Sequence, residues 1–140
     1  MFGIKIQDKR PGGGWLSFGL ADVLKVIGEP ALCSEWRCLN LRYIGPKDET
    51  WDELLEKRRR FSGQEFFDFA ARIGQIIDGE FIAKKHGSNK AWLIIKAVDS
   101  GWFEVWSSKP KVLEEMKSKF IKVTPLSNGG LEQALGADSL

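Results

Sequence analysis

Hydrophobic and polar residues alternate along several stretches of the chain, with the period of two that is typical of half-buried β-strands. The pattern is densest between Gly79 and Pro125, where it predicts a strand, a turn, a strand, a tight turn, a strand, a helix and a last strand. Ala91 to Val98 is nearly apolar on both faces, which indicates a central strand. The predicted strands are 2–7, 36–44, 81–85, 91–98, 102–106 and 121–123. The expected faces of 36–44 are Leu39, Leu41 and Tyr43 on one side and Cys38, Asn40 and Arg42 on the other.

Apolar residues that recur at three- and four-residue steps predict the helices. One helix runs from Leu20 to Ile27, with Ser17 as its candidate N-cap and with Gly28 and Pro30 as its stop. A later helix opens with Ser108 and Pro110, and its sheet-facing residues are Val112, Leu113, Met116 and Phe120.

Two capping boxes, in which a hydroxyl and a carboxylate satisfy the free amides of a first helical turn, mark two further helices. Thr50 with Glu53 predicts a helix that starts near Trp51. Ser62 with Glu65 predicts a helix over 62–77, which contains Gly74. A helical glycine costs about 1 kcal/mol relative to alanine. We therefore expect another strand to cross close to Gly74.

Together these elements predict one α+β domain over residues 1–126. We expect about five to six strands in a mainly antiparallel sheet, with about three to four helices packed mostly on one face. Residues 127–140 open with Ser-Asn-Gly-Gly and are expected to form a flexible tail or a marginal helix.

The composition of the chain indicates what general class of protein it is. The chain has 140 residues, of which 43% are hydrophobic and 29% charged, as in an average globular domain. Its net charge of +2 is too small to indicate nucleic acid as the partner. The apolar runs are far shorter than the roughly 20 residues that cross a bilayer, and no secretion signal is visible. With only two cysteines and no need of a disulfide, the chain is expected to be soluble and cytoplasmic.

No residue pattern predicts a catalytic, cofactor or metal site. Cys33 and Cys38 point to opposite faces if the chain between them is extended, and His86 is the one other strong metal ligand, so both cysteines are expected to be small buried hydrophobes. His86 lies in a polar turn and is expected on the surface. The glycines of 11–14 lack the Lys-Ser or Lys-Thr of a phosphate loop and predict a mobile hairpin loop.

Acidic residues offer no readable catalytic pair either. Asp78, Glu80, Asp99 and Glu104 are scattered through predicted strands and turns, where surface or turn roles are the expected assignments. The sequence therefore favours a protein that is not an enzyme, although a site assembled from distant residues stays open.

The densest charge run, 57–60, contains Arg58, Arg59 and Arg60. These three are candidate contacts to phosphates. The same run lies in the last turn of the helix predicted near Trp51, where basic residues complement the helix dipole. A solvated helix end is therefore favoured over nucleic-acid binding.

Six tryptophans are present, and Trp92, Trp102 and Trp106 lie in the predicted meander. Alternation places all three on one face together with Glu104. Such a face either caps the core or anchors a protein partner.

Three functions follow from these patterns. The first is a non-enzymatic interaction protein (an inhibitor, adaptor or immunity-type partner) that docks through the tryptophan face or through the polar loops around Lys47 and His86; it is compatible with a homo-oligomer. The alternative is a small-molecule or enzymatic pocket built from dispersed residues, for which Arg42, Asp99 and Glu104 are candidates. Nucleic-acid binding through Arg58, Arg59 and Arg60 ranks third.

Overall fold

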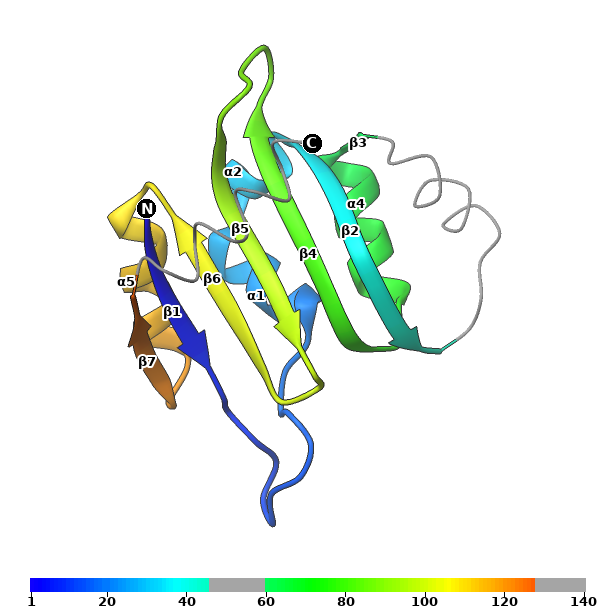
Figure 1. Cartoon of the computed structure of the whole chain (residues 1–140), viewed down its shortest axis with the longest axis vertical. Coiled ribbons are helices and arrows are strands. Elements are labelled where there is room, and N and C mark those ends of the chain that lie inside the picture. Colours follow the sequence, from blue (N-terminus) through cyan, green and yellow to red (C-terminus); the bar gives the residue numbers. More distant parts are fainter. Residues whose placement is uncertain (46–59, 128–140) are drawn as a thin grey trace.

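A computed structural model describes residues 1–45 and 60–127 of the chain. Within these residues seven strands form one antiparallel sheet in the order β3-β2-β4-β5-β6-β1-β7 (Figure 1). The predicted α+β class is confirmed, with one strand more than expected, and β5 is the central strand as predicted. The strands are β1 (Phe2–Ile6), β2 (Ser34–Ile44), β3 (Phe61–Ser62), β4 (Gln75–Lys85), β5 (Ala91–Val98), β6 (Trp102–Ser107) and β7 (Val123–Leu126).

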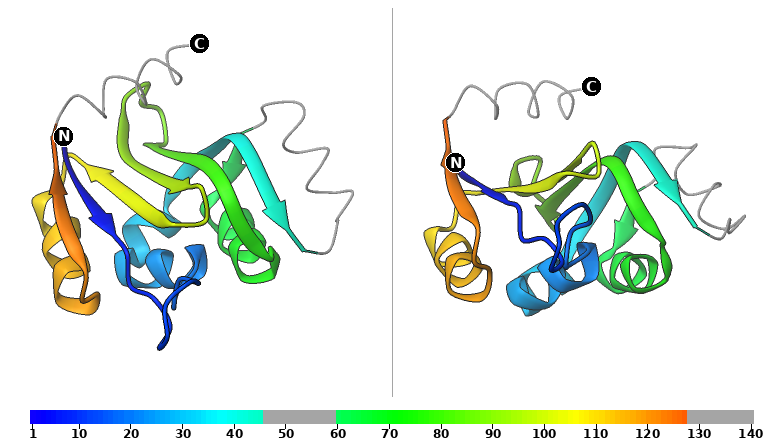
Figure 2. Two further views of the ribbon diagram at one scale, coloured as in Figure 1. Left: turned by 60° about the horizontal axis from the view of Figure 1, so that its bottom comes forward. Right: turned by 90° about the horizontal axis from the view of Figure 1, so that it is seen from below.

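The described helices all lie on one face of the sheet, as the right-hand view in Figure 2 shows. They are α1 (Leu20–Ile27), α2 (Glu29–Leu32), α4 (Gly63–Arg72) and α5 (Pro110–Lys119). The main core fills the space between helices and sheet, where Trp36 stacks on Phe66 with 4.2 Å between ring centroids. The Trp36 indole N–H donates to the Ala31 carbonyl at 2.9 Å. We call the sheet face opposite the described helices the open face.

Helix α4 starts as its capping box predicts and ends earlier than predicted. The Glu65 amide donates to Ser62 Oγ at 3.1 Å, and the Ser62 amide donates to Glu65 Oε1 at 3.0 Å. The helix stops at Arg72, and residues 75–77, which were expected to be helical, belong to β4. The β-branched Ile73, Ile76 and Ile77 favour extended backbone, so the sheet overrides the helical spacing.

Gly74 lies where β2 ends. A Cβ atom at Gly74 would overlap the Ile44 carbonyl oxygen and approach the Gly45 Cα to 2.8 Å. The prediction that a strand crosses close to Gly74 is therefore confirmed, although Gly74 lies between α4 and β4 rather than inside a helix. Glycine is required here because two backbone segments touch.

A β-bulge in β2 changes the predicted faces of this strand. The β2–β4 register shifts between Leu39 and Arg42, and Asn40 adopts a left-handed backbone with φ of 55°. Leu39 consequently packs on the open face, whereas Leu41 packs against the main core. The prediction that these two leucines share one face was wrong, because the bulge breaks the alternation.

Three further boundaries differ from the predictions. The N-cap of α1 is Gly19 rather than Ser17, and the Gly19 amide donates to Asp22 Oδ2 at 2.8 Å. Pro30 lies in the first turn of α2, a position that tolerates its missing N–H. The last strand begins at Val123 and includes Pro125, which an edge strand accepts. The helix predicted near Trp51 and most of the predicted tail, from residue 128 on, fall outside the described residues.

None of the described helices combines the length and the hydrophobicity that a bilayer span requires.

We expect Gly74→Ala to lower the free energy of unfolding by about 1–3 kcal/mol, because the new methyl group meets backbone that cannot move aside. Urea denaturation followed by tryptophan fluorescence measures the change. Gly101→Ala is the matched control, since a Cβ there makes only ordinary contacts at 3.7 Å. Equal stability of the Gly74 and Gly101 variants would contradict the close approach.

Candidate functional site

Trp92 does not lie on the tryptophan face that alternation predicted. Ala91 pairs with Lys84 and Leu93 with Ala83, so Trp92 is an extra residue in β5. This irregularity turns its side chain into the main core, where it is 5% exposed. Its indole N–H donates to Ser34 Oγ at 2.9 Å, and Lys109 Nζ lies 4.4 Å from the ring centroid. Trp92 therefore has a structural role.

Trp102, Glu104 and Trp106 share the open face as predicted. The two indole N–H groups donate to the two oxygens of the Glu104 carboxylate, at 3.0 Å from Trp102 and 3.1 Å from Trp106. Lys5 Nζ lies 4.1 Å from the Trp102 ring centroid. Hydrogen bonds to a charged carboxylate are stronger than those to a neutral acceptor, so Glu104 fixes both rings.

Trp106 covers Gly3 of β1, its partner in the neighbouring strand. A Cβ atom at Gly3 would overlap carbon atoms of the Trp106 ring, so only glycine allows this contact. Trp106 is 1% exposed and belongs to an apolar cluster on the open face. The other buried members of this cluster are Leu39, Ile82 and Ile94. Trp106, one of the three tryptophans of the predicted docking face, is thus buried.

Charged residues of alternating sign cross the open face beside this cluster. Glu80 of β4, Lys96 of β5, Glu104 of β6 and Lys5 of β1 are successive partners in the sheet register. Opposite charges at directly opposed positions stabilise neighbouring strands.

A polar recess of about 340 Å³ lies at one end of this charged row. Arg42 and Asp78 form an ion pair at its rim with 3.0 Å between Nη1 and Oδ2. Asp78 also accepts the Asp99 amide at 2.8 Å, so the structure brings the predicted pocket residues Arg42 and Asp99 together. Glu104, the third residue predicted for that pocket, does not line the recess. The lining residues are Asn40, Arg42, Asp78, Gly79, Glu80, Lys96, Ala97 and Val98.

Glu80 is less exposed than the sequence suggested. Its Oε2 atom is buried and has no hydrogen-bond partner among the residues that the structure describes. A buried polar atom without a partner costs about 1–3 kcal/mol, and more when it carries charge. Periodicity alone gave no sign that this atom is buried.

A second recess lies at the glycine-rich hairpin. The hairpin forms as predicted, with the Arg10 amide donating to the Trp15 carbonyl at 2.9 Å. Gly12, Gly13 and Gly14 all have φ between 80° and 90°, a conformation that other residues rarely adopt. Trp15 follows them and is 56% exposed.

The base of the hairpin is fixed by Asp8. Its carboxylate accepts the backbone amides of Ile121 and Lys122 at 2.6 to 3.1 Å, in the connection between α5 and β7. These hydrogen bonds therefore anchor the base of the hairpin to the body of the domain.

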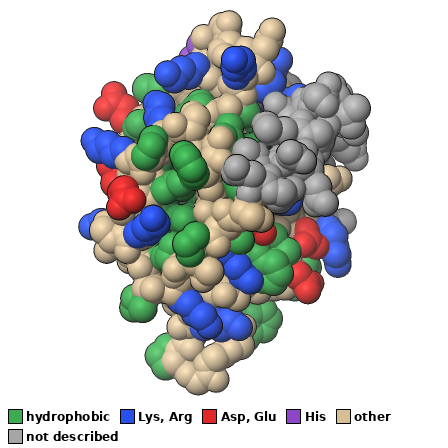
Figure 3. Space-filling view, turned by 60° about the vertical axis from the view of Figure 1, so that its left-hand side comes forward, with side chains coloured by type: hydrophobic (Ala, Val, Ile, Leu, Met, Phe, Trp, Pro, Cys, Tyr) green, Lys and Arg blue, Asp and Glu red, His purple; other side chains and the backbone are tan. Residues whose placement is uncertain are grey.

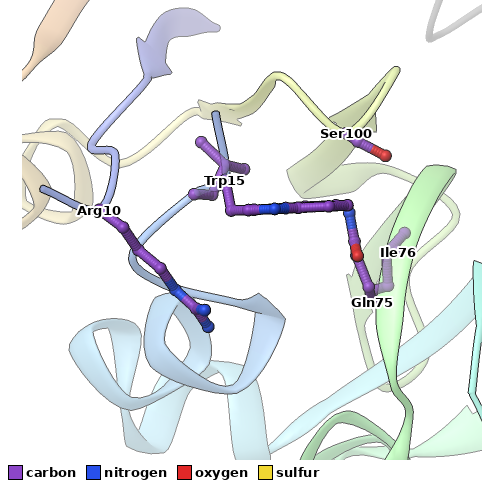
Figure 4. A pocket seen from close by; sticks show the side chains of 6 residues that line it. Arg10, Trp15, Gln75, Ile76 and Ser100 are labelled. Carbon is purple, nitrogen blue, oxygen red and sulfur yellow. The ribbon is translucent and has the colours of Figure 1, made fainter. Parts of the chain in front are cut away.

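The recess beside the hairpin has a volume of about 380 Å³. In Figure 4 the Trp15 ring extends from the hairpin toward Gln75 at the start of β4, with Ser100 of the β5–β6 turn beside it. Ile44 pairs with Gln75 in the sheet and is 59% exposed. The recess is lined by Arg10, Trp15, Leu16, Gln75, Ile76 and Ser100. We call Arg10, Trp15, Ile44, Gln75 and Ser100 the hairpin-end surface.

Of the predicted basic contacts, Arg58 and Arg59 fall outside the described residues. Arg60 Nη1 lies 3.5 Å from Glu35 Oε2, so its charge is partly balanced. His86 is exposed as expected, with Nδ1 3.0 Å from Glu35 Oε1. On the face that Figure 3 shows, acidic and basic side chains are interspersed outside the grey region.

The two cysteines differ. Cys38 is buried as expected, whereas Cys33 is exposed, because it follows α2 rather than lying in an extended strand. Burial raises the pKa of the Cys38 thiol strongly, and the negative charge of Glu80 adds to this shift.

Comparison of the chain with protein-family models, with curated proteins and with solved structures gave no match.

Trp15 was not among the tryptophans that the sequence pattern placed on a docking face, which were those of the meander. One signal was present: an aromatic residue that directly follows three glycines falls in a loop, where no partner strand or helix buries it.

We expect Glu104→Gln to lower the free energy of unfolding by about 1–2 kcal/mol, because the amide NH₂ group cannot accept the second indole N–H. Urea denaturation measures this change, and the indole N–H resonances of Trp102 and Trp106 should shift in NMR spectra. Glu114→Gln, on an exposed position of α5, is the control. Unchanged stability and unshifted indole signals would show that Glu104 does not hold the rings.

We expect iodoacetamide at pH 8 to label native protein once, at Cys33. The raised pKa of Cys38 leaves little of the reactive thiolate, and burial blocks the reagent. Intact-mass spectrometry should show one adduct on the native chain and two after unfolding in urea. Two adducts formed at similar rates on native protein would contradict the burial of Cys38.

Proposed function

We propose that the protein is a non-enzymatic protein-interaction module, an inhibitor, adaptor or immunity-type partner, that docks through the hairpin-end surface. The observation that carries this proposal is Trp15, a large aromatic side chain 56% exposed on a hairpin with a fixed base. Tryptophan is among the residues that contribute most to binding energy at protein interfaces.

The burial of the meander tryptophans favours the hairpin over the sheet face as the docking surface. Trp92 and Trp106 are 5% and 1% exposed, and their indole N–H groups are already paired. A partner that used them would first have to disrupt the core. Trp15 requires no such rearrangement.

The chemistry of the hairpin-end surface indicates what the partner presents. Arg10 is the one charged residue among the described residues that line the recess, and its guanidinium suits a carboxylate. Gln75 and Ser100 offer an amide and a hydroxyl for hydrogen bonds. Trp15, which lines the recess with Gln75, and Ile44, the sheet partner of Gln75, offer exposed apolar area. A partner with an acidic side chain next to an apolar one fits this combination.

We expect Trp15→Ala to weaken the complex with the protein partner by about 30-fold or more, which corresponds to the roughly 2 kcal/mol of an interface hot spot. Tagged protein captures the partner from its native cells, mass spectrometry identifies it, and titration calorimetry with the purified partner measures the dissociation constant. Arg10→Gln should weaken binding less and should reduce its salt dependence.

Phe2→Ala is the matched control, because Phe2 is 65% exposed and pairs with Ser107 at the opposite end of β6 from the β5–β6 turn. It should leave the dissociation constant unchanged. Melting temperatures of all variants, taken first, separate loss of binding from loss of fold. A purified partner that binds the Trp15 variant as tightly as the original chain would overturn the proposal, as would a stoichiometric partner whose binding depends on Phe2 and not on Trp15.

A further inference from the structure

The apolar cluster on the open face is fully buried at its centre, although no described helix lies over it (Figure 2). Ile82, Ile94 and Trp106 are successive partners in the β4–β5–β6 register and are 0%, 0% and 1% exposed. Antiparallel sheets with one covered face commonly leave the other face in water. The burial of three large side chains on this face therefore indicates a cover that the described helices do not provide.

Basic side chains lie on the same face beside the cluster. Lys84 follows Ala83, which packs in the main core, so alternation places Lys84 on the open face, where it is only 7% exposed. Arg37 lies on this face as well, because Trp36 beside it packs in the main core. Both cations take part in interactions, and buried cations favour carboxylate partners. A segment that lies over this face gains from carrying carboxylates as well as apolar side chains.

The chain leaves the described part of the structure beside this cluster. Leu126, the last residue of β7, packs against the cluster, and residues 128–140, which we call the tail segment, follow soon after it. Four strand spacings of about 4.8 Å, or about 19 Å, separate β7 from β4. The 13 residues of the tail segment span about 20 Å even at the helical rise of about 1.5 Å per residue. The tail segment is therefore long enough to cross the open face from β7 to β4.

The sequence of the tail segment matches the chemistry of the open face. Leu131, Ala134 and Leu135 recur at three- and four-residue steps, so one side of a helical turn would carry all three. Glu132 and Asp138 are the two charged side chains of the segment, and both are acidic. The segment thus combines an apolar side with negative charge, and the open face combines an apolar cluster with buried positive charge.

We propose that the tail segment docks on the open face of its own chain. Leu131 and Leu135 complete the apolar cluster around Trp106, and Asp138, farther along the segment, approaches Lys84. The open face is then an internal surface of the molecule, and a partner protein reaches Trp106 only after the tail segment has been displaced. This inference does not depend on the hairpin-end surface.

Nuclear Overhauser effects in the isotope-labelled full chain test the docking directly. We expect cross-peaks from the methyl groups of Leu131 and Leu135 to the ring protons of Trp106 and to the methyl groups of Ile82 or Ile94. The absence of all these cross-peaks overturns the proposal. A sample that mixes labelled and unlabelled chains identifies the source of the contact, and cross-peaks that arise only between two chains also overturn docking within one chain.

A substitution in the tail segment of the full chain gives a second test. Leu135→Ser should lower the melting temperature by about 4 °C or more, because it removes buried apolar area. The same substitution should make the indole N–H of Trp106 exchange with solvent at least tenfold faster. Ile121→Ser is the matched control, since Ile121 is 95% exposed and should tolerate the change. Equal melting temperatures of the two variants, with unchanged exchange at Trp106, contradict the proposal.

Discussion

A seven-stranded sheet with its described helices on one side only is the constraint from which the rest of this structure follows. The covered face is held by ordinary burial, with Trp36 stacked on Phe66 at its centre. The open face, which no described helix covers, is stabilised in another way. It combines an apolar cluster around Trp106 with a row of alternating charges, and Glu104 joins the two by accepting both indole N–H groups. Removal of that carboxylate would leave two polar donors without their acceptor.

Helix and strand ends that depend on capping or turn residues could be predicted from the sequence. The Ser62 capping box and the bounds of β5 could be assigned from short-range patterns, because the hydrogen-bonding groups and turn residues that define them are neighbours in the chain. The length of β4 could not be predicted in this way. The apolar spacing of residues 75–77 is typical of a helix, and these residues join the sheet because they pair with β2.

Two of the three register irregularities in the described sheet, those at Asn40 and Trp92, explain most of the remaining differences at the candidate sites. A bulge depends on the register between two strands, and neither strand contains that information alone. At Asn40 the bulge separates Leu39 from Leu41 and shapes the recess around Glu80. At Trp92 the irregularity turns the side chain away from the open face, where alternation had predicted it. Sequence reasoning thus identified the aromatic residues of the meander correctly and assigned one of them to the wrong face.

Pro125 limits how this sheet meets other strands. The Gln7 amide donates to the Lys122 carbonyl, so alternation along the β1–β7 pair turns the nitrogen of Pro125 away from β1. The outer edge of β7 consequently lacks an N–H donor in the middle of a four-residue strand. A strand from another molecule that added here would gain few hydrogen bonds, so this margin of the sheet resists the edge-to-edge growth that leads to fibrils.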